Sequence, residues 1–104
     1  MLILELGGIE IAVRDGDLLG RSGVGKEYFQ GYPYDAVSRL HARFFLRDGQ
    51  WFVEDNQSTN GTFVNGTRIA NPTPLHTGDE IRLGTEVVLR VKQVPSSHPG
   101  PEKI

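Results

Sequence analysis

The sequence is dominated by a repeated hairpin signal, in which two short apolar segments flank a dipeptide that contains glycine. Turn dipeptides of this kind occur at Gly7-Gly8, Asp48-Gly49, Asn65-Gly66 and Gly84-Thr85. Glycine adopts the positive φ angles that tight turns require, so each dipeptide is expected to join two antiparallel strands. The flanking segments predict strands at 2–6 and 9–13, 42–47 and 50–54, 63–64 and 67–69, and 80–83 and 86–92.

Apolar residues alternate with polar ones in these segments, as they do on a strand with one buried face. Phe44 and Leu46 are expected to share one face, with Arg43 and Arg47 on the opposite face. Similar apolar rows are Trp51 and Val53, Ile81 and Leu83, and Val87, Leu89 and Val91. No segment keeps a helical apolar period over eleven residues. The pattern therefore predicts an all-β fold, an antiparallel sandwich or barrel.

The rest of the chain divides into loops and a tail. Leu18-Leu19 is expected to continue a strand after a turn at Asp15-Gly16. Residues 22–37 predict a long loop rich in glycine and aromatic side chains, and loops of this length are usually functional or mobile. Residues 95–104 contain three prolines and two serines and predict a flexible tail or linker. The domain itself is expected to cover residues 1–94.

Composition and charge argue against several function classes. The chain has 104 residues, enough for one hydrophobic core, and its net charge of -2 creates no basic field to attract nucleic acid or an anionic membrane. It contains no cysteine, which excludes disulfides, a thiol nucleophile and cysteine-based metal sites. Residues 1–13 are interrupted by glycines and glutamates and are not expected to form a signal peptide. We expect a cytoplasmic, monomeric domain with no nucleic acid and no membrane as partner.

One pattern favours secretion instead. Acceptor sequences for N-glycosylation begin at Asn56, Asn60 and Asn65. Asn-Gly is also the strongest dipeptide signal for a tight turn. Because no secretion signal is expected, the turn interpretation is preferred.

Four clusters of polar residues lie at strand ends or between strands, at Gly20-Arg21, 38–41, 58–62 and 64–66. Loops at one end of a sandwich converge on a single surface. Arg21 and Arg39 supply guanidinium groups that match phosphate oxygens, and Ser38 supplies a hydroxyl. Thr59 and Asn60 add a hydroxyl, an amide and backbone N–H groups. No carboxylate is among them, so the set suits a phosphate, whose charge is about -1.5 to -2 near neutral pH.

In this order, the Gly-Arg, Ser-Arg-x-His and Ser-Thr-Asn-Gly-Thr-x-Val-Asn-Gly motifs resemble those of the forkhead-associated (FHA) domain family. Residues 75–84 also resemble the closing strand-turn-strand segment of that family, and the resemblance covers residues 1–94. It implies a sandwich of two twisted antiparallel sheets with the binding loops at one end. It also implies binding of phosphothreonine in a partner protein or peptide, with no cofactor.

The resemblance assigns roles by position. The phosphopeptide contacts it implies are Arg21, Ser38, Arg39, Thr59 and Asn60. The residues it implies as structural supports of the site are Gly20, His41, Gly61 and Asn65. The loop at 27–33 is longer and more aromatic than the family pattern, which bears on partner preference.

Catalysis is the first alternative, since Ser38 and His41 are a nucleophile and a base in one segment. If that segment is extended, an offset of three places the two side chains on opposite faces. No oxyanion-hole motif accompanies them. We therefore expect no enzyme activity and a structural His41 that bonds backbone groups of a neighbouring loop. His76 and His98 show no ligand spacing, and no metal site is expected.

A nucleotide-binding P-loop is the second alternative, because residues 20–26 nearly match that motif. Glu27 stands where the P-loop requires serine or threonine, and a helix must follow, which residues 28–33 do not predict. The third alternative is an interaction domain that keeps the fold without binding phosphate. The sequence leaves open whether Tyr28, Phe29, Tyr32 and Tyr34 pack in the core or line a partner groove.

Overall fold

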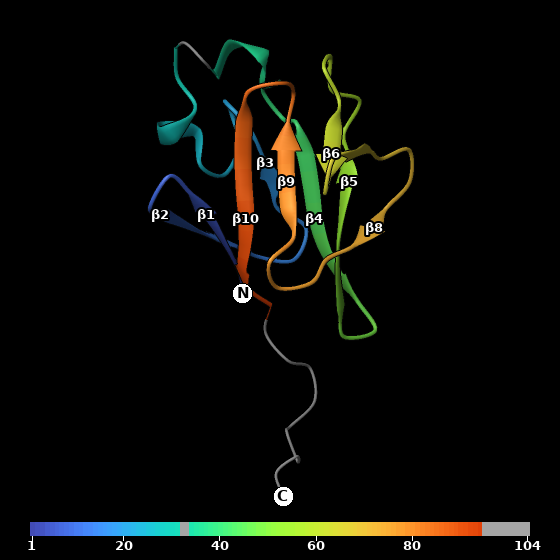
Figure 1. The fold of residues 1–104 in the computed structure, drawn as a ribbon. Helices are drawn as coiled ribbons and strands as arrows, with labels where there is room; N and C mark the ends of the chain where they lie inside the picture. The colour runs from blue at the N-terminus through green and yellow to red at the C-terminus, as the bar shows by residue number, and fades with distance from the viewer. Residues whose placement is uncertain (32–33, 95–104) are drawn as a thin grey trace, which may run out of the picture.

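The computed structural model describes residues 1–31 and 34–94, which form two antiparallel sheets packed as a sandwich (Figure 1). The six-stranded sheet has the order β2 (Ile9–Val13), β1 (Leu2–Leu6), β10 (Val87–Gln93), β9 (Glu80–Leu83), β6 (Thr62–Val64) and β7 (Thr67–Arg68). The four-stranded sheet has the order β3 (Leu18–Leu19), β4 (Ala42–Arg47), β5 (Gln50–Asp55) and β8 (Thr73–Pro74). The predicted all-β fold is confirmed.

The four predicted hairpins are all present, as β1–β2, β4–β5, β6–β7 and β9–β10. Their turns use the left-handed backbone that the dipeptides predict, with φ of 50° at Asn65 and 86° at Gly66. Strand ends differ from the prediction by one residue at several places. The two-residue strand β8, which includes a proline, was not predicted. It lies at the sheet edge, where proline is tolerated.

The prediction of strand at Leu18-Leu19 after the turn at Asp15-Gly16 is confirmed, but this strand does not stay in the sheet of the strand before the turn. These residues pair with β4 in the four-stranded sheet, whereas β2 lies in the six-stranded sheet. The turn between them carries the chain from one layer to the other, and it is held by the Gly16 N–H, which donates to the Phe44 carbonyl at 2.7 Å. Sheet membership depends on this long-range pairing, which local pattern does not encode.

The prediction that Phe44 and Leu46 share one face of β4 is confirmed, but only part of that face is buried. Phe44 is fully buried, but Leu46 is 42% exposed. The two share one face of β4, and Figure 1 shows the β4–β5 hairpin projecting beyond the rest of the sandwich, so its tip is not covered. On the opposite face Phe45 is nearly buried, because it stacks on Phe52 at 5.4 Å and lies under the guanidinium of Arg43.

The core lies between the two sheets and also takes side chains from the long loop. Phe29 and Val37 of that loop are fully buried, and Tyr28 and Tyr34 pack against the core. Phe29 meets Tyr34 edge to face at 5.7 Å. Three of the four aromatic residues therefore anchor the loop to the core, while Tyr32 lies outside the described residues.

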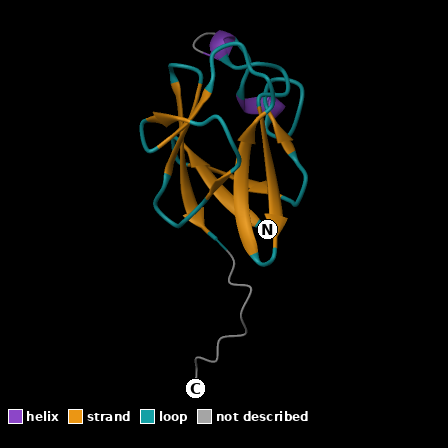
Figure 2. Cartoon of the chain, turned by 90° about the vertical axis from the view of Figure 1, so that its right-hand side faces the viewer, coloured by secondary structure: helices purple, strands orange, loops and turns teal. Residues whose placement is uncertain are grey.

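The long loop contains two single helical turns, η1 (Lys26–Tyr28) and η2 (Tyr34–Ala36). Figure 2 places both at one end of the sandwich. No helix among the described residues is long and apolar enough to cross a membrane. The single turn η1 is not the extended helix that a P-loop requires. The tail predicted at 95–104 lies outside the described residues.

Candidate functional site

Three chain segments meet at the end of the sandwich that carries the helical turns. They follow β3, precede β4 and connect β5 to β6, and together they enclose a cavity of ≈ 590 Å³. The cavity is lined by Arg21, Ser22, Ser38, Arg39, Leu40, Asn56, Gln57 and Thr59. Four of the five predicted contact residues are thus brought together from three separate segments. No carboxylate lines this cavity, so its charge comes from two arginines.

Gly20 allows two of these segments to approach closely. A Cβ atom at this position would lie 2.6 Å from the carbonyl oxygen of Ser38 and closer still to that of Arg39. The approach lets the Arg21 N–H donate to the Ser38 carbonyl at 3.3 Å and the Ser22 N–H donate to the Arg39 carbonyl at 2.8 Å. A side chain at position 20 would separate the two arginines' segments.

Arg21 is half-buried, and its Nε–H donates to the carbonyl oxygen of Val37. This bond fixes the guanidinium plane and uses the inner nitrogen. The two terminal Nη groups make no ion pair with another described residue. They present a planar pair of donors of the kind that binds phosphate oxygens bidentately.

Ser38 connects the first two segments to the third. Its hydroxyl oxygen accepts a hydrogen bond from the Thr59 N–H at 3.1 Å. A hydroxyl that accepts one bond can still donate its own hydrogen, so Ser38 retains a donor for a ligand. Thr59 and Arg39 are exposed at the cavity wall.

His41 lies beneath the cavity and is fully buried. Its Nδ1 accepts a hydrogen bond from the Ser38 N–H at 2.9 Å, so Nδ1 carries no proton. Its Nε2 then carries the proton and donates to the Gly61 carbonyl at 2.7 Å. Burial lowers the pKa of His41, although the bond to Gly61 and the charge of Asp55 act in the opposite direction. Neutral His41 therefore holds the Ser38 and Gly61 segments together through their backbones.

Residues 38–41 are not extended, so the argument that places Ser38 and His41 on opposite faces does not apply. Residues 38–41 form a turn, so the His41 ring folds back toward Ser38 instead of facing away. Both ring nitrogens are nevertheless engaged by backbone groups. In this arrangement His41 has no free nitrogen to accept a proton from the Ser38 hydroxyl.

Asp55, at the end of β5, organises the loop that carries Thr59. Its carboxylate accepts bonds from the Ser58 N–H at 3.0 Å, from the Ser58 hydroxyl and from the buried Thr62 hydroxyl at 2.7 Å. Burial alone would raise the pKa of Asp55, but these donors and His41 outweigh it, so the pKa is lowered. Asp55 was not among the predicted site residues. The signal was available, because aspartate three positions before serine is typical of a side-chain-capped turn.

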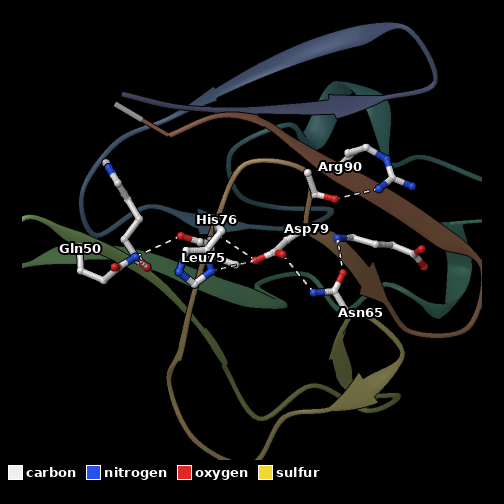
Figure 3. Close-up of polar contacts among 9 residues, drawn as sticks. Gln50, Asn65, Leu75, His76, Asp79 and Arg90 are labelled. Atoms are coloured by element: carbon white, nitrogen blue, oxygen red, sulfur yellow. Dashed lines mark hydrogen bonds and ion pairs between the residues drawn. The ribbon is translucent and has the colours of Figure 1, made fainter. Parts of the chain in front are cut away.

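Asn60 and Asn65, two of the predicted site residues, do not line the cavity. The Asn60 amide donates to the Ala36 carbonyl at 2.9 Å and so ties its loop to η2. Asn65 lies at the far end of β6, where its amide donates to Asp79 at 3.0 Å and its carbonyl oxygen accepts from the Glu80 N–H at 2.9 Å (Figure 3). Asn65 thus holds the β6–β7 turn against the start of β9.

Four residues of the cavity wall were not predicted, namely Ser22, Leu40, Asn56 and Gln57. Asn56 donates from its amide to the Leu40 carbonyl at 3.0 Å, and its N–H donates to the His41 carbonyl at 2.9 Å. Leu40 is 41% exposed and is the one large apolar side chain in the wall. The sequence signal for Leu40 is its place at the variable position of the Ser-Arg-x-His motif.

These features define a class of protein: a β-sandwich recognition module whose end loops form a carboxylate-free cavity lined by two arginines. The family model of the FHA domain matches residues 18–84. The chain belongs to the FHA domain family.

Similar proteins support this assignment. A 51-residue stretch is 53% identical to the E3 ubiquitin-protein ligase rnf8 of Danio rerio, covering 46% of this chain and 10% of that protein. The chain thus spans about a tenth of that relative's length.

Solved FHA domains have the same fold. One comes from a structural and functional analysis of phosphothreonine-dependent FHA domain interactions. Its TM-score is 0.72 at 31% identity, and the match covers 90% of this chain and 97% of that chain. Another is the yeast Dun1 FHA domain, solved in complex with a doubly phosphorylated (pT) peptide derived from Rad53 SCD1. Its TM-score is 0.62 at 29% identity, and the match covers 99% of this chain and 79% of that chain.

Proposed function

We propose that this domain binds phosphothreonine-containing segments of a partner protein in the cavity lined by Arg21, Ser38, Arg39 and Thr59. The observation that carries the proposal is the convergence of two arginines and a hydroxyl donor on one cavity wall that contains no carboxylate. Membership of the FHA family supports it, as does the phosphothreonine-dependent binding named for a solved neighbour.

Each contact has a distinct role in this proposal. The Nη groups of Arg21 bind two phosphate oxygens, because its Nε is already held by Val37. The Ser38 hydroxyl donates to a third oxygen while it accepts from Thr59. Arg39 is exposed and supplies charge from the rim. Asn60 does not contact the phosphate in this proposal, because its side-chain amide donates to the Ala36 carbonyl and so holds the loop in place.

The methyl group of phosphothreonine provides a second element of recognition. Phosphoserine presents the same phosphate, so the arginines and Ser38 alone do not distinguish the two. We propose that an apolar niche beside the Thr59–Asn60 loop takes up the methyl group. Burial of one methyl contributes about 0.8 kcal/mol, and a shaped pocket reaches about 1–3 kcal/mol.

The domain is proposed to act by binding alone and not by catalysis. The one serine–histidine pair at the cavity has both imidazole nitrogens committed to backbone groups, which supports this proposal. We further propose that residues 1–94 form the binding domain and 95–104 a linker. The cytoplasmic location stays a prediction, based on residues 1–13, which are not expected to form a signal peptide.

Titration calorimetry with three peptides tests the function. The peptides are identical except for phosphothreonine, phosphoserine or unphosphorylated threonine at one position, at matched salt and pH. We expect the phosphothreonine peptide to bind with a dissociation constant of about micromolar, the phosphoserine peptide several-fold more weakly, and the third not measurably.

Two outcomes of this titration would contradict parts of the proposal. Equal binding of the phosphothreonine and phosphoserine peptides would remove the methyl niche from the mechanism. If phosphorylation has no effect across a pool of phosphothreonine sequences, the chain is an interaction domain that does not use the phosphate site.

A further inference from the structure

The outer face of the six-stranded sheet carries a row of three cross-strand neighbours that the proposed site does not use. Phe63 of β6 is paired with Arg68 of β7 on one side and with Arg82 of β9 on the other. The guanidinium of Arg82 lies over the Phe63 ring, 4.8 Å from its centroid. We call these three residues the Phe63 row.

The two arginines of the row have no acidic partner among the described residues. On the same face Lys92 pairs with Glu10 at 2.8 Å, and Arg90 donates to the Gly78 carbonyl at 2.8 Å, so both of these cations already have a partner in the protein. The Nε of Arg82 is moreover buried and makes no hydrogen bond. A cation that has lost part of its hydration interacts more strongly with an incoming anion, because the surroundings screen the charge less.

The row is continuous with the proposed phosphopeptide site. The guanidinium of Arg68 lies against the backbone of Gly61, where an added Cβ would be 2.8 Å from its Nε. Gly61 is the residue that accepts the His41 hydrogen bond. It follows Thr59 of the cavity wall by two residues, which limits the separation along the backbone to about 7 Å.

We propose that the Phe63 row is a second docking surface, which binds an acidic segment of the same partner whose phosphothreonine enters the cavity. This inference rests on the proposed function. Arginine forks match carboxylates bidentately, and Phe63 offers an apolar surface between them. Strands β7 and β9 flank β6, so their backbones are about 10 Å apart, and an extended segment spans that distance with acidic residues about three positions apart.

The opposite sheet provides a control surface of the same composition. There Phe45 of β4 lies under Arg43 and Arg47, at 4.9 and 5.3 Å from the ring centroid. Arg43 is paired with Glu54 at 3.0 Å, and Phe45 is covered by Phe52. Arg47→Gln therefore removes an arginine from an aromatic ring without touching the Phe63 row.

The test is a titration of three kinds of phosphothreonine peptide. The first is a short peptide. The second extends it, before or after the phosphothreonine, with a block of alternating acidic and small residues. The third carries glutamines in place of the acidic residues. Each peptide is titrated with the parent, with Arg68→Gln, with Arg68→Gln combined with Arg82→Gln, and with Arg47→Gln.

We expect one of the acidic extensions to strengthen binding about fivefold over its glutamine copy, since two ion pairs on one segment contribute modestly. The gain should shrink in Arg68→Gln, disappear in the double variant and persist in Arg47→Gln. Melting curves check that each variant is folded. If Arg82→Gln destabilises the sheet, the single variant Arg68→Gln still tests the surface, because Arg68 is exposed.

The outcomes separate this inference from the proposed function. If the short phosphopeptide does not bind at all, the proposed function fails and the docking surface falls with it. If the short peptide binds and neither acidic extension gains affinity, or the gain survives in the double variant, only the docking surface is overturned. The docking surface is also overturned if a second phosphothreonine in the extension increases the affinity and carboxylates do not.

Discussion

The Nε2 atom of His41 lies 2.7 Å from the carbonyl oxygen of Gly61, so a fully buried side chain before β4 holds the backbone of the β5–β6 loop. The other ring nitrogen accepts from the Ser38 N–H at 2.9 Å. One neutral imidazole thus fixes the separation between the cavity wall that carries Ser38 and the wall that carries Thr59. The geometry of the proposed phosphate site depends on a residue that does not line it.

The first prediction concerns the protonation of His41. Its pKa is lowered from 6.5 in the folded protein, so the unfolded chain takes up the proton first as the pH falls. The stability that neutral His41 contributes is present above its ordinary pKa and is lost as the pH falls below about 6.5. The melting temperature of the free domain should therefore fall between pH 7.5 and 5.5.

Two variants check this assignment. His41→Gln should melt at a lower temperature at pH 7.5 and show a flatter dependence over that range. His76→Gln, which changes an exposed histidine, should keep the parent's dependence. If His41→Gln retains the full slope, another group is responsible. His41→Ala should lower the melting temperature and weaken binding together, and abolished binding at unchanged stability would make His41 a direct contact.

The second prediction concerns Arg21. Hydrogen bonds to charged groups contribute about 1.5–3 kcal/mol each, and a bidentate arginine makes two. Arg21→Ala should therefore weaken phosphopeptide binding at least about tenfold by calorimetry while the domain stays folded. Arg21→Lys should restore little binding, because the single ammonium nitrogen of lysine cannot take the places of Nε at the Val37 carbonyl and of both Nη atoms at the phosphate. Arg47→Ala, at the opposite end of β4 from the cavity, should bind like the parent. Parent-like binding by Arg21→Ala would exclude Arg21 as the phosphate clamp.

The third prediction concerns Asp55. Its carboxylate accepts three hydrogen bonds, two from Ser58 and one from Thr62, whereas asparagine offers one acceptor oxygen. Asp55→Asn should cost about 1–3 kcal/mol of the free energy of unfolding, measured in urea at pH 7. The pKa of Asp55 is lowered below 3.8, so its stabilisation is lost only as the pH falls below that value, and the difference from the parent should close there.

Asp48→Asn is the matched control for Asp55. Asp48 lies in the β4–β5 turn with φ of 51°, a conformation that asparagine adopts readily. This variant should unfold like the parent. Equal losses in the two variants would show that a general charge effect, and not the loop network, accounts for the result.

The fourth prediction concerns Gly20. A Cβ at this position would meet the carbonyl oxygens of Ser38 and Arg39 inside contact distance, so Gly20→Ala must push the two segments apart. Binding should weaken by at least about tenfold, since the Arg21–Ser38 geometry is lost. Gly8→Ala is the control, because it has positive φ but open space, and it should lower stability by about 1 kcal/mol with binding unchanged. Unimpaired binding by Gly20→Ala would contradict this account of the close approach.

The sequence by itself determined the hairpins, because turn dipeptides and alternation act between neighbours in the chain. At Asn65-Gly66 the dipeptide predicts the left-handed turn that the structure has. The sequence also identified four candidate contacts, since each stands in a short motif whose chemistry suits an anion: Arg21, Ser38, Arg39 and Thr59. All four line the cavity.

The tertiary structure alone decided the relationships between distant segments. It placed β3 in the four-stranded sheet, left Leu46 exposed at an uncovered hairpin tip and gave the Asn60 amide to Ala36. It also brought Arg68 against Gly61. These contacts join residues that are not neighbours in the sequence, and their free energy depends on how the two sheets pack. A local pattern carries no information on that packing, which is why only the folded chain reveals it.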